Sequence, residues 1–258
     1  MERKCFLMKK IFLFVLICSP LVQVRAQEYH VDPGAVIILD RMSEIIGNLN
    51  SCSFTVHTST EKFDQEKGYL KDFYKLEVYM AGPDKMHVLN EGSKGKTGYW
   101  YNGDMLLYYA VNTNQYGFIE TPDNITETID FVYREYDLEY PAADFFYPGF
   151  TDDLLGTHER VSYEGLVKIN GVEVHHIVAY GKETNVQIWI SNDTFALPIR
   201  YLIHDLTNDK PLQFEGVFSN WVLNPVLPDA MFEFVVPESA SRISILSKSS
   251  TYINSPEQ

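Results

Sequence analysis

Residues 167–223 constrain the fold more than any other part of the sequence. They form a series of short segments rich in Val, Ile, Phe, Tyr and Trp, and turn-forming residues separate each segment from the next. Asn170-Gly171 lies between two such segments, and this dipeptide is the strongest short-range signal for a β-hairpin. Asn192-Asp193 and the run from Asn208 to Pro211 separate later segments in the same way. We therefore expect consecutive antiparallel strands in this region.

The first 26 residues have the features of a secretory signal peptide. Four basic residues precede an apolar core at 11–22, and the segment ends on the small residue Ala26. An N-terminal anchor helix is the alternative, but this apolar core is shorter than the roughly 20 residues that span a bilayer. Cys18 suggests a lipoprotein signal, although the bulky Ile17 precedes it, and lipidation of Cys18 stays open. We predict export to the periplasm, cleavage after Ala26 and no stable membrane anchor.

Removal of this segment leaves a strongly acidic chain with one cysteine. The full chain has 21 basic and 35 acidic residues; the segment contains five of the basic ones and one acidic one, so the exported chain has a net charge of −18. Such a surface repels nucleic acid and anionic lipid head groups, although simple solubility is an alternative explanation of the charge. Cys52 remains alone, which excludes an internal disulfide. It opens an ordinary strand, so we expect it to be buried rather than to act as a nucleophile.

The exported chain should begin with one amphipathic helix. Asp32 predicts an N-cap, and Pro33 follows at the first helical position. Apolar residues then recur at three- and four-residue spacing from Ala35 to Leu49. This pattern predicts a helix with a wide apolar face that ends at about 48–51.

About six strands should follow, between Phe54 and Thr121, because apolar and polar residues alternate there between turn signals. Residues 124–136 then predict a short helix, and residues 140–155 predict one or two short helices with a kink. The β pattern resumes near Gly156 and runs to Asn224. A last short strand is expected at 231–235.

This order of elements indicates an antiparallel α+β protein. Many strands are apolar on both faces, as in the segment Met-Leu-Leu-Tyr-Tyr-Ala at 105–110, so either both faces are covered or the sheet curls. We therefore predict an incomplete, half-open antiparallel β-barrel of about 11 strands, with a long N-terminal helix and a central helical lid or plug. A single domain at 27–246 and a polar tail at 247–258 complete the predicted organisation.

Several short motifs occur in a recognisable order. They are Asp32-Pro33, Gly82-Pro83-Asp84-Lys85, Tyr101-Asn102-Gly103-Asp104, Pro141-Ala142-Ala143-Asp144, Asn170-Gly171-Val172, Gln187-Ile188-Trp189-Ile190, Leu197-Pro198-Ile199-Arg200, Trp221 and residues 232–237. With these motifs, the chain resembles a family of predicted bacterial periplasmic proteins of unknown function within the LolA/LolB-like superfamily. The resemblance implies helices that form a lid over an apolar cavity, which in the well-known relatives receives the acyl chains of lipoproteins. No individual functional residue carries over.

Polar residues give little indication of catalysis. His175 and His176 are neighbours on a predicted strand and point to opposite faces, so they cannot bind one metal ion together. His175 and His204 can meet across strands, but the sequence places no third ligand nearby. Acidic residues at 135–139 and 152–153 are better explained as a solvated face than as a catalytic pair. We therefore predict no catalytic residue, no metal site and no cofactor, with a hydrolase as the less favoured alternative.

Aromatic residues are concentrated in the middle of the chain, and they favour a site for an apolar ligand. Long acyl chains need a broad apolar surface, because each buried CH2 group contributes about 0.8 kcal/mol. An ordinary aromatic core is the alternative. The candidate residues for the cavity wall and the lid are Tyr99, Tyr101, Tyr109, Tyr116, Phe118, Phe145, Phe146, Phe150, Trp189 and Trp221.

The favoured hypothesis is a periplasmic, non-catalytic carrier or binding protein for an apolar ligand, with the helices at 124–155 as a lid. The expected partners are a lipid or a lipidated protein, with other envelope proteins as further possibilities, and the chain is expected to be a monomer. The alternative is a structural or partner-binding envelope protein whose cavity is filled by its own side chains and which acts through an outer surface or a sheet edge.

Overall fold

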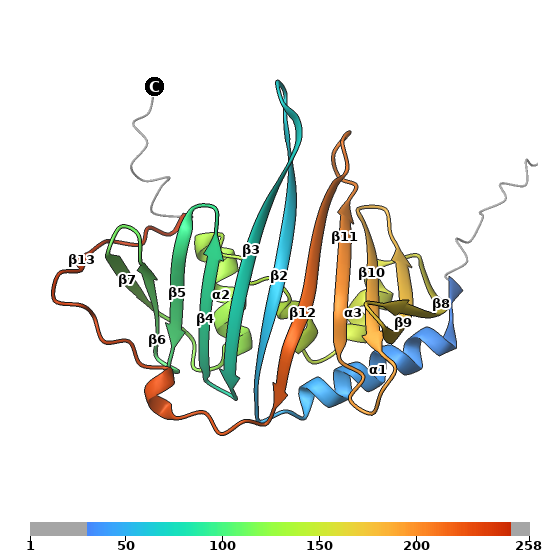
Figure 1. The fold of residues 1–258 in the computed structure, drawn as a ribbon, viewed down its shortest axis with the longest axis horizontal. Helices are drawn as coiled ribbons and strands as arrows, with labels where there is room; N and C mark the ends of the chain where they lie inside the picture. Colours follow the sequence, from blue (N-terminus) through green and yellow to red (C-terminus); the bar gives the residue numbers. More distant parts are fainter. Residues whose placement is uncertain (1–29, 249–258) are drawn as a thin grey trace, which may run out of the picture.

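The computed structural model describes residues 30–248, and the described strands form one 13-stranded sheet. The order across the sheet is β1-β8-β9-β10-β11-β12-β2-β3-β4-β5-β6-β7-β13 (Figure 1). The strands are β1 (His30–Val31), β2 (Ser51–Asp64), β3 (Gly68–Ala81), β4 (Lys85–Gly92), β5 (Gly95–Tyr101), β6 (Met105–Ala110), β7 (Gln115–Glu120), β8 (Arg160–Ile169), β9 (Val172–Tyr180), β10 (Thr184–Ser191), β11 (Pro198–Asp205), β12 (Leu212–Leu223) and β13 (Ser241–Arg242).

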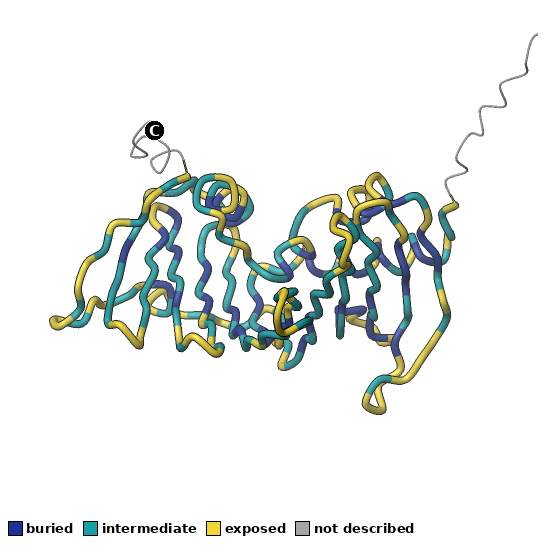
Figure 2. The backbone as a smooth tube through the Cα atoms, turned by 90° about the horizontal axis from the view of Figure 1, so that it is seen from above, coloured by how far each residue is buried: buried dark blue, intermediate teal, exposed yellow. Residues whose placement is uncertain are grey.

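The sheet is curved and half open, as predicted from the sequence. Its long strands pair antiparallel, and β1 and β13 add a short parallel strand at each edge. Helices α2 (Ile125–Tyr136) and α3 (Phe150–Thr157) lie on its concave side (Figure 2). We call this the inner face. The 3-10 helix η1 (Ala143–Phe146) connects the two helices.

Helix α1 (Pro33–Gly47) forms as its sequence predicts. The Asp32 carboxylate accepts a hydrogen bond from the Gly34 amide at 2.8 Å, so it caps the helix, and Pro33 occupies the first turn. The buried residues are Ala35, Leu39, Met42 and Ile46, spaced three and four apart. This stripe faces the core, and α1 packs against β8, η1 and α3.

Helix α2 begins at a second side-chain cap, because the Asn124 amide oxygen accepts a hydrogen bond from the Glu127 amide at 2.9 Å. Ile125, Ile129 and Val132 form its buried stripe. The helix ends at Asp137, which has the left-handed backbone conformation (φ 60°) typical of a helix end. The predicted helical insertion is therefore confirmed, and the kink expected between 140 and 155 lies between η1 and α3.

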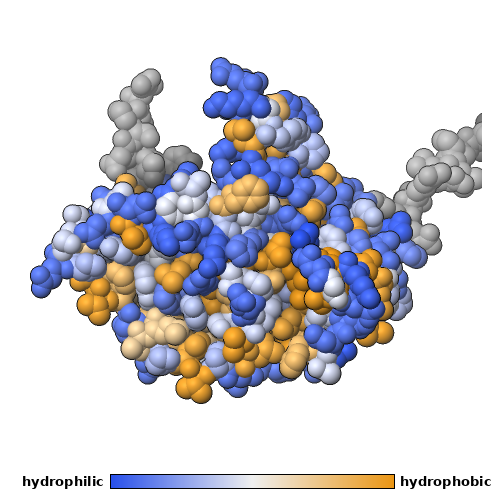
Figure 3. Space-filling model, in the orientation of Figure 1, coloured by the Kyte–Doolittle hydropathy of each residue, from blue (hydrophilic) through white to orange (hydrophobic). Residues whose placement is uncertain are grey.

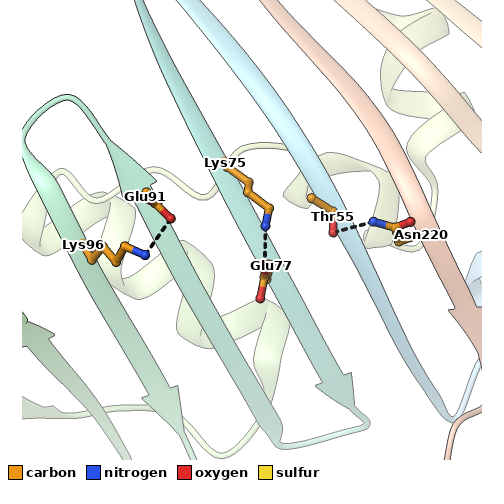
Figure 4. Close-up of polar contacts among 6 residues, drawn as sticks. All are labelled: Thr55, Lys75, Glu77, Glu91, Lys96 and Asn220. Atoms are coloured by element: carbon orange, nitrogen blue, oxygen red, sulfur yellow. Dashed lines mark hydrogen bonds and ion pairs between the residues drawn. The ribbon is translucent and has the colours of Figure 1, made fainter.

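The outer, convex face of the sheet is more polar in composition than the apolar inner face. It carries both polar and apolar patches (Figure 3). Exposed ion pairs lie along it, Lys75–Glu77 at 2.5 Å and Lys96–Glu91 at 2.9 Å (Figure 4). Such exposed pairs contribute little to stability, about 0–1 kcal/mol.

A β-bulge in β12 stands at the centre of this face. Asn220 has φ 56° where the register with β2 shifts, and its amide donates a hydrogen bond to the Thr55 hydroxyl at 3.3 Å (Figure 4). The bulge adds local twist to the middle of the sheet.

Two details of the sequence prediction were wrong. The count of about 11 strands omitted β1 and β13, which have two residues each and depend on contacts distant in sequence. The expected strand at 231–235 does not form. Residues 229–231 make the 3-10 helix η2 (Asp229–Met231) instead, and Phe234 packs on the outer face against Trp100 and Tyr109, with ring centroids 4.4 and 4.9 Å apart. An irregular segment that packs one side against the sheet can thus show the same alternation of apolar residues as a strand.

Other sequence expectations fall partly or wholly outside the described residues. The predicted signal segment at 1–26 and residues 249–258 of the predicted tail lie there. Within residues 30–248, no helix combines the length and the apolar character needed to cross a membrane.

Candidate ligand-binding site

The centre of the inner face is an apolar floor built by strand register. Phe54 of β2 lies opposite Val78 of β3, Val78 opposite Val88 of β4, and Val88 opposite Tyr99 of β5. Phe54, Val78 and Val88 are each at most 6% exposed. Because residues two apart on a strand share a face, Leu76, Met80 and Met86 extend the same surface.

A short segment of the chain lies directly on this floor. We call residues 140–146 the plug, and residues 125–157, which contain it, the cover. Phe146 stacks on Phe54 with ring centroids 5.6 Å apart and an interplanar angle of 14°. Phe145 packs against Phe150, Tyr201 and Phe218, with ring centroids 5.0 to 5.5 Å apart. The plug thus places Phe145 within the core and the half-buried Phe146 against it.

The cover changes direction at three left-handed residues, Asp137 (φ 60°), Ala142 (φ 71°) and Gly149 (φ 92°). Glycine adopts this conformation readily, whereas alanine adopts it at a cost, so Ala142 stores strain within the plug. Its side chain is 5% exposed, and the surrounding packing holds it in place. The cover is therefore a set of short pieces rather than one long helix.

A small cavity remains between the plug and the floor. Its volume is about 20 Å³, room for about one water molecule. The floor contributes Phe54, Leu76, Val78, Met80, Met86 and Val88, and the cover contributes Ile129, Tyr140, Pro141, Ala142, Ala143 and Phe146. The protein's own side chains therefore fill most of the space that the sequence analysis assigned to a ligand.

The structure divides the ten predicted site residues between the two faces. Six lie on the inner face or in the cover and belong to the core or pack against it: Tyr99, Tyr101, Phe145, Phe146, Phe150 and Trp221. Only Phe146 lines the cavity directly. Tyr101 is fully buried, and its hydroxyl donates a hydrogen bond to the Pro122 carbonyl at 2.8 Å.

The other four, Tyr109, Tyr116, Phe118 and Trp189, lie on the outer face. Trp189 stacks on His176 with ring centroids 4.7 Å apart, while its neighbours Ile188 and Ile190 are buried in the core. Tyr116 lies opposite Tyr109, and the Arg242 guanidinium lies over the Phe118 ring at 4.3 Å. These four side chains do not line the cavity.

Sequence reasoning missed most of the residues that do line it. Leu76, Val78 and Val88 are ordinary aliphatic residues, and only the alternation along their strands marks them as facing one side. Pro141, Ala142 and Ala143 of the plug are small and apolar. Their position in a break between helices was the available signal.

Titratable groups near the core are held in their neutral forms. Burial raises the pKa of the Tyr140 phenol well above its usual value, with a further contribution from Tyr99. Burial also raises the pKa of Tyr201, and the nearby Asp144 carboxylate adds to the effect. The Cys52 thiol is 2% exposed, and burial raises its pKa to about 12.

The histidines are tied to structural partners. The His175 ring is 2.9 Å from the Tyr163 hydroxyl, and the His176 ring is 3.0 Å from the Gln187 side chain. His175 lies opposite Ile190 and His204 opposite Asn185, near different ends of β10, so these two histidines do not meet. Residues 30–248 hold no group of three or more His, Cys, Asp or Glu side chains suited to a metal ion.

A second, more open depression lies beside α1. It has a volume of about 590 Å³ and lies against Arg41, Glu44, Ile45, Asn48, Leu49, Phe195, Leu223 and Asn224. Arg41 donates a hydrogen bond to the Thr194 carbonyl at 3.2 Å. This groove is partly polar and exposed to solvent, in contrast to the central cavity.

Comparison with known proteins gives one family match and several distant structural similarities. The model of a family described as a predicted periplasmic protein (DUF2092) matches residues 35–246. An uncharacterized conserved protein from Thermus thermophilus is 12% identical, with a TM-score of 0.47, over 82% of this chain and 99% of that one. No curated protein matches the sequence.

Two further solved structures are similar. The lipoprotein LppX of Mycobacterium tuberculosis is 12% identical, with a TM-score of 0.46, over 76% of this chain and 98% of that one. A LolA superfamily protein from Nitrosomonas europaea is 14% identical, with a TM-score of 0.37, over 78% of this chain and 97% of that one.

Proposed function

The chain belongs to the DUF2092 family of predicted periplasmic proteins, and we propose that it is a binding protein for an apolar ligand there. The ligand lies between the inner face of the sheet and the cover. It is a lipid or the acyl chain of a lipidated protein, and the protein holds it without covalent chemistry.

The observation that carries this proposal is the apolar floor with a residual cavity beneath a segmented cover. Where the plug borders the cavity, its lining residues are mostly apolar, and its Phe146 ring stacks on Phe54 of the floor. An acyl chain offers the same kind of contact, since each buried CH2 group contributes about 0.8 kcal/mol. A ligand therefore replaces Phe146 and the rest of η1 on the floor, with little change in the apolar area that is buried, while Tyr140, which precedes Ala142, keeps its place.

The joints of the cover support this exchange. The plug contains only one helical turn, at η1, and strained Ala142 lies at its start. Release of this strain favours the displaced state and lowers the cost of opening. The cover acts as a lid whose closed form is the structure described above.

The small size of the cavity favours a second candidate function. A volume of about 20 Å³ holds no acyl chain without movement of the plug. If the plug does not move, the protein is a partner-binding envelope protein that acts through its outer face or a sheet edge. Stable capture of one protein partner by a lipid-free chain is the expected behaviour in that case.

The test is extraction of the protein purified from its native envelope, followed by mass spectrometry of small molecules. We expect one class of amphiphile at near-equal stoichiometry. A matched pair of variants on β4 gives the control. Val88 faces the cavity and Leu89 the opposite face, so Val88→Phe should lose the ligand and Leu89→Phe should keep it. Wild-type protein that is empty in every preparation contradicts the proposal.

A further inference from the structure

Three buried polar atoms near the central cavity have no hydrogen-bond partner among the described residues. They are the Tyr140 hydroxyl, the Asn90 side-chain oxygen and the Thr97 hydroxyl, which approaches the Tyr99 phenol without forming a hydrogen bond of normal geometry. An unpartnered polar group away from water destabilises a protein, and such groups are rare in folded chains. Three of them in one region therefore need an explanation.

The strand register brings these groups to one end of the floor. Asn90 lies two residues beyond Val88 on β4, about 7 Å further along the same face. Thr97 of β5 lies directly opposite Asn90, and Leu76, which lines the cavity, lies opposite Asn90 on the other side. Asn90 and Thr97 therefore continue the floor of the cavity as a polar extension.

Tyr140 joins this extension from the cover. Its side chain lines the cavity, and its ring meets the Tyr99 ring edge to face at 5.7 Å. Tyr99 lies two residues from Thr97 on the same face of β5. The three groups thus come from β4, β5 and the plug, and Tyr99, which contacts Tyr140 and shares a face with Thr97, links them where the apolar floor ends.

The chemistry of this end specifies the kind of head group that it accepts. The Tyr140 and Thr97 hydroxyls can each donate and accept a hydrogen bond, and the Asn90 oxygen accepts one. The residues that line the cavity, together with Asn90 and Thr97 beyond it, include no Lys, Arg, Asp or Glu. A charged head group would lose its hydration there without an ion partner, which is strongly unfavourable.

We propose that Asn90, Thr97 and Tyr140 form the head-group end of the ligand site, and that the site takes uncharged amphiphiles whose head group both donates and accepts hydrogen bonds. A primary alcohol and a secondary amide are the two simplest groups with this property. This inference rests on the proposed function, since it assumes that a ligand chain occupies the floor beside these groups.

The test is displacement of the fluorescent probe N-phenyl-1-naphthylamine by three ligands of equal chain length. These are 1-dodecanol, its methyl ether and dodecanoate at pH 7.5. The ether cannot donate a hydrogen bond, and the carboxylate is charged. We expect 1-dodecanol to bind about tenfold more tightly than either, since one lost hydrogen bond in a buried site changes affinity by about that factor.

The Tyr140→Phe variant provides the second readout. It should reduce the preference for 1-dodecanol over the ether, and it should raise the melting temperature of the empty protein, because it removes an unpartnered hydroxyl. Tyr163→Phe is the matched control: its hydroxyl has a partner in His175 at 2.9 Å. This control should lower the melting temperature and leave the preference unchanged.

The outcomes separate the two proposals. If all three ligands bind equally and Tyr140→Phe changes neither preference nor melting temperature, the head-group site is wrong while the apolar site stands. A lower melting temperature in Tyr140→Phe would also contradict the head-group site, because it would mean that the hydroxyl has a stabilising partner in the empty protein. If no ligand displaces the probe and none binds directly, both proposals fail.

Discussion

Replacement of Phe146 by alanine should both destabilise the empty protein and improve its binding of apolar ligands. Phe146 stacks on Phe54 at 5.6 Å and lies 6.4 Å from Trp221, measured between ring centroids. Truncation of a fully buried phenylalanine costs about 3–5 kcal/mol. Phe146 is half-buried, so we expect a loss of about 2 kcal/mol in the free energy of unfolding.

The same truncation opens space over the floor. The cavity of about 20 Å³ gains the volume of the lost ring, and an apolar cavity of that kind stays dry and accepts apolar guests. A guest recovers contacts that the protein has lost. The gain in affinity is therefore at most the destabilisation, about 2 kcal/mol or about 30-fold.

Urea denaturation measures the first effect and titration with N-phenyl-1-naphthylamine the second. Phe73→Ala is the control, because Phe73 is 65% exposed and lies outside the cavity. It should change the free energy of unfolding by no more than about 0.5 kcal/mol and leave probe affinity unchanged. A Phe146→Ala protein that is less stable but binds the probe no better would refute the idea that the plug occupies the ligand site.

The remaining predictions concern three single groups: Cys52, His87 and Asp32. The Cys52 thiol should react with a thiol reagent at pH 8 only as fast as the protein unfolds, because burial raises its pKa from 9.0 to about 12; rapid labelling of native protein would contradict its burial. Because only the unfolded thiol ionises between these values, stability should also fall as the pH rises above 9. Burial lowers the pKa of His87 from 6.5 to about 4, so the unfolded chain takes up the proton first and stability falls as the pH drops below 6.5. Between pH 7 and 5, the free energy of unfolding of His87→Phe should fall by about 1 kcal/mol less than that of the wild type, a figure reduced for the partial exposure of His87. Equal shifts of the urea midpoint in both proteins would contradict this. Asp32→Ala should cost about 1 kcal/mol through loss of the α1 cap, measured by thermal denaturation, whereas exposed mid-helix Asp40→Ala should not; equal effects would argue against the cap.

Local signals in the sequence predicted most elements of the fold. Asn170-Gly171 forms the expected hairpin turn, with φ values of 52° and 84°. Asp32 and Asn124 cap their helices because their side chains reach backbone amides two and three residues away. These contacts join residues that are close together in the sequence, so local sequence patterns predict them.

The candidate site was harder to predict because it depends on which face of each strand turns inward. Ile188, Trp189 and Ile190 are all large and apolar, but only the two isoleucines enter the core. Alternation gives the two sets of residues on a strand without saying which set is covered. The edge strand β1 was missed for a different reason. The Asp32 amide beside it donates a hydrogen bond to the Val161 carbonyl at 2.8 Å, and no local sequence pattern predicts a contact between residues so far apart in the chain.

Photo-crosslinking with a fatty alcohol that carries a diazirine at its chain end tests the central claim most directly. After irradiation, peptide mapping by mass spectrometry locates the labelled residues. We predict labels on the floor and the plug, at residues 54, 76–88 and 140–146, with competition by unlabelled 1-dodecanol. Labels confined to the outer face, at Trp189 or Phe118, or labels that 1-dodecanol does not reduce, would contradict a ligand site between the sheet and its cover.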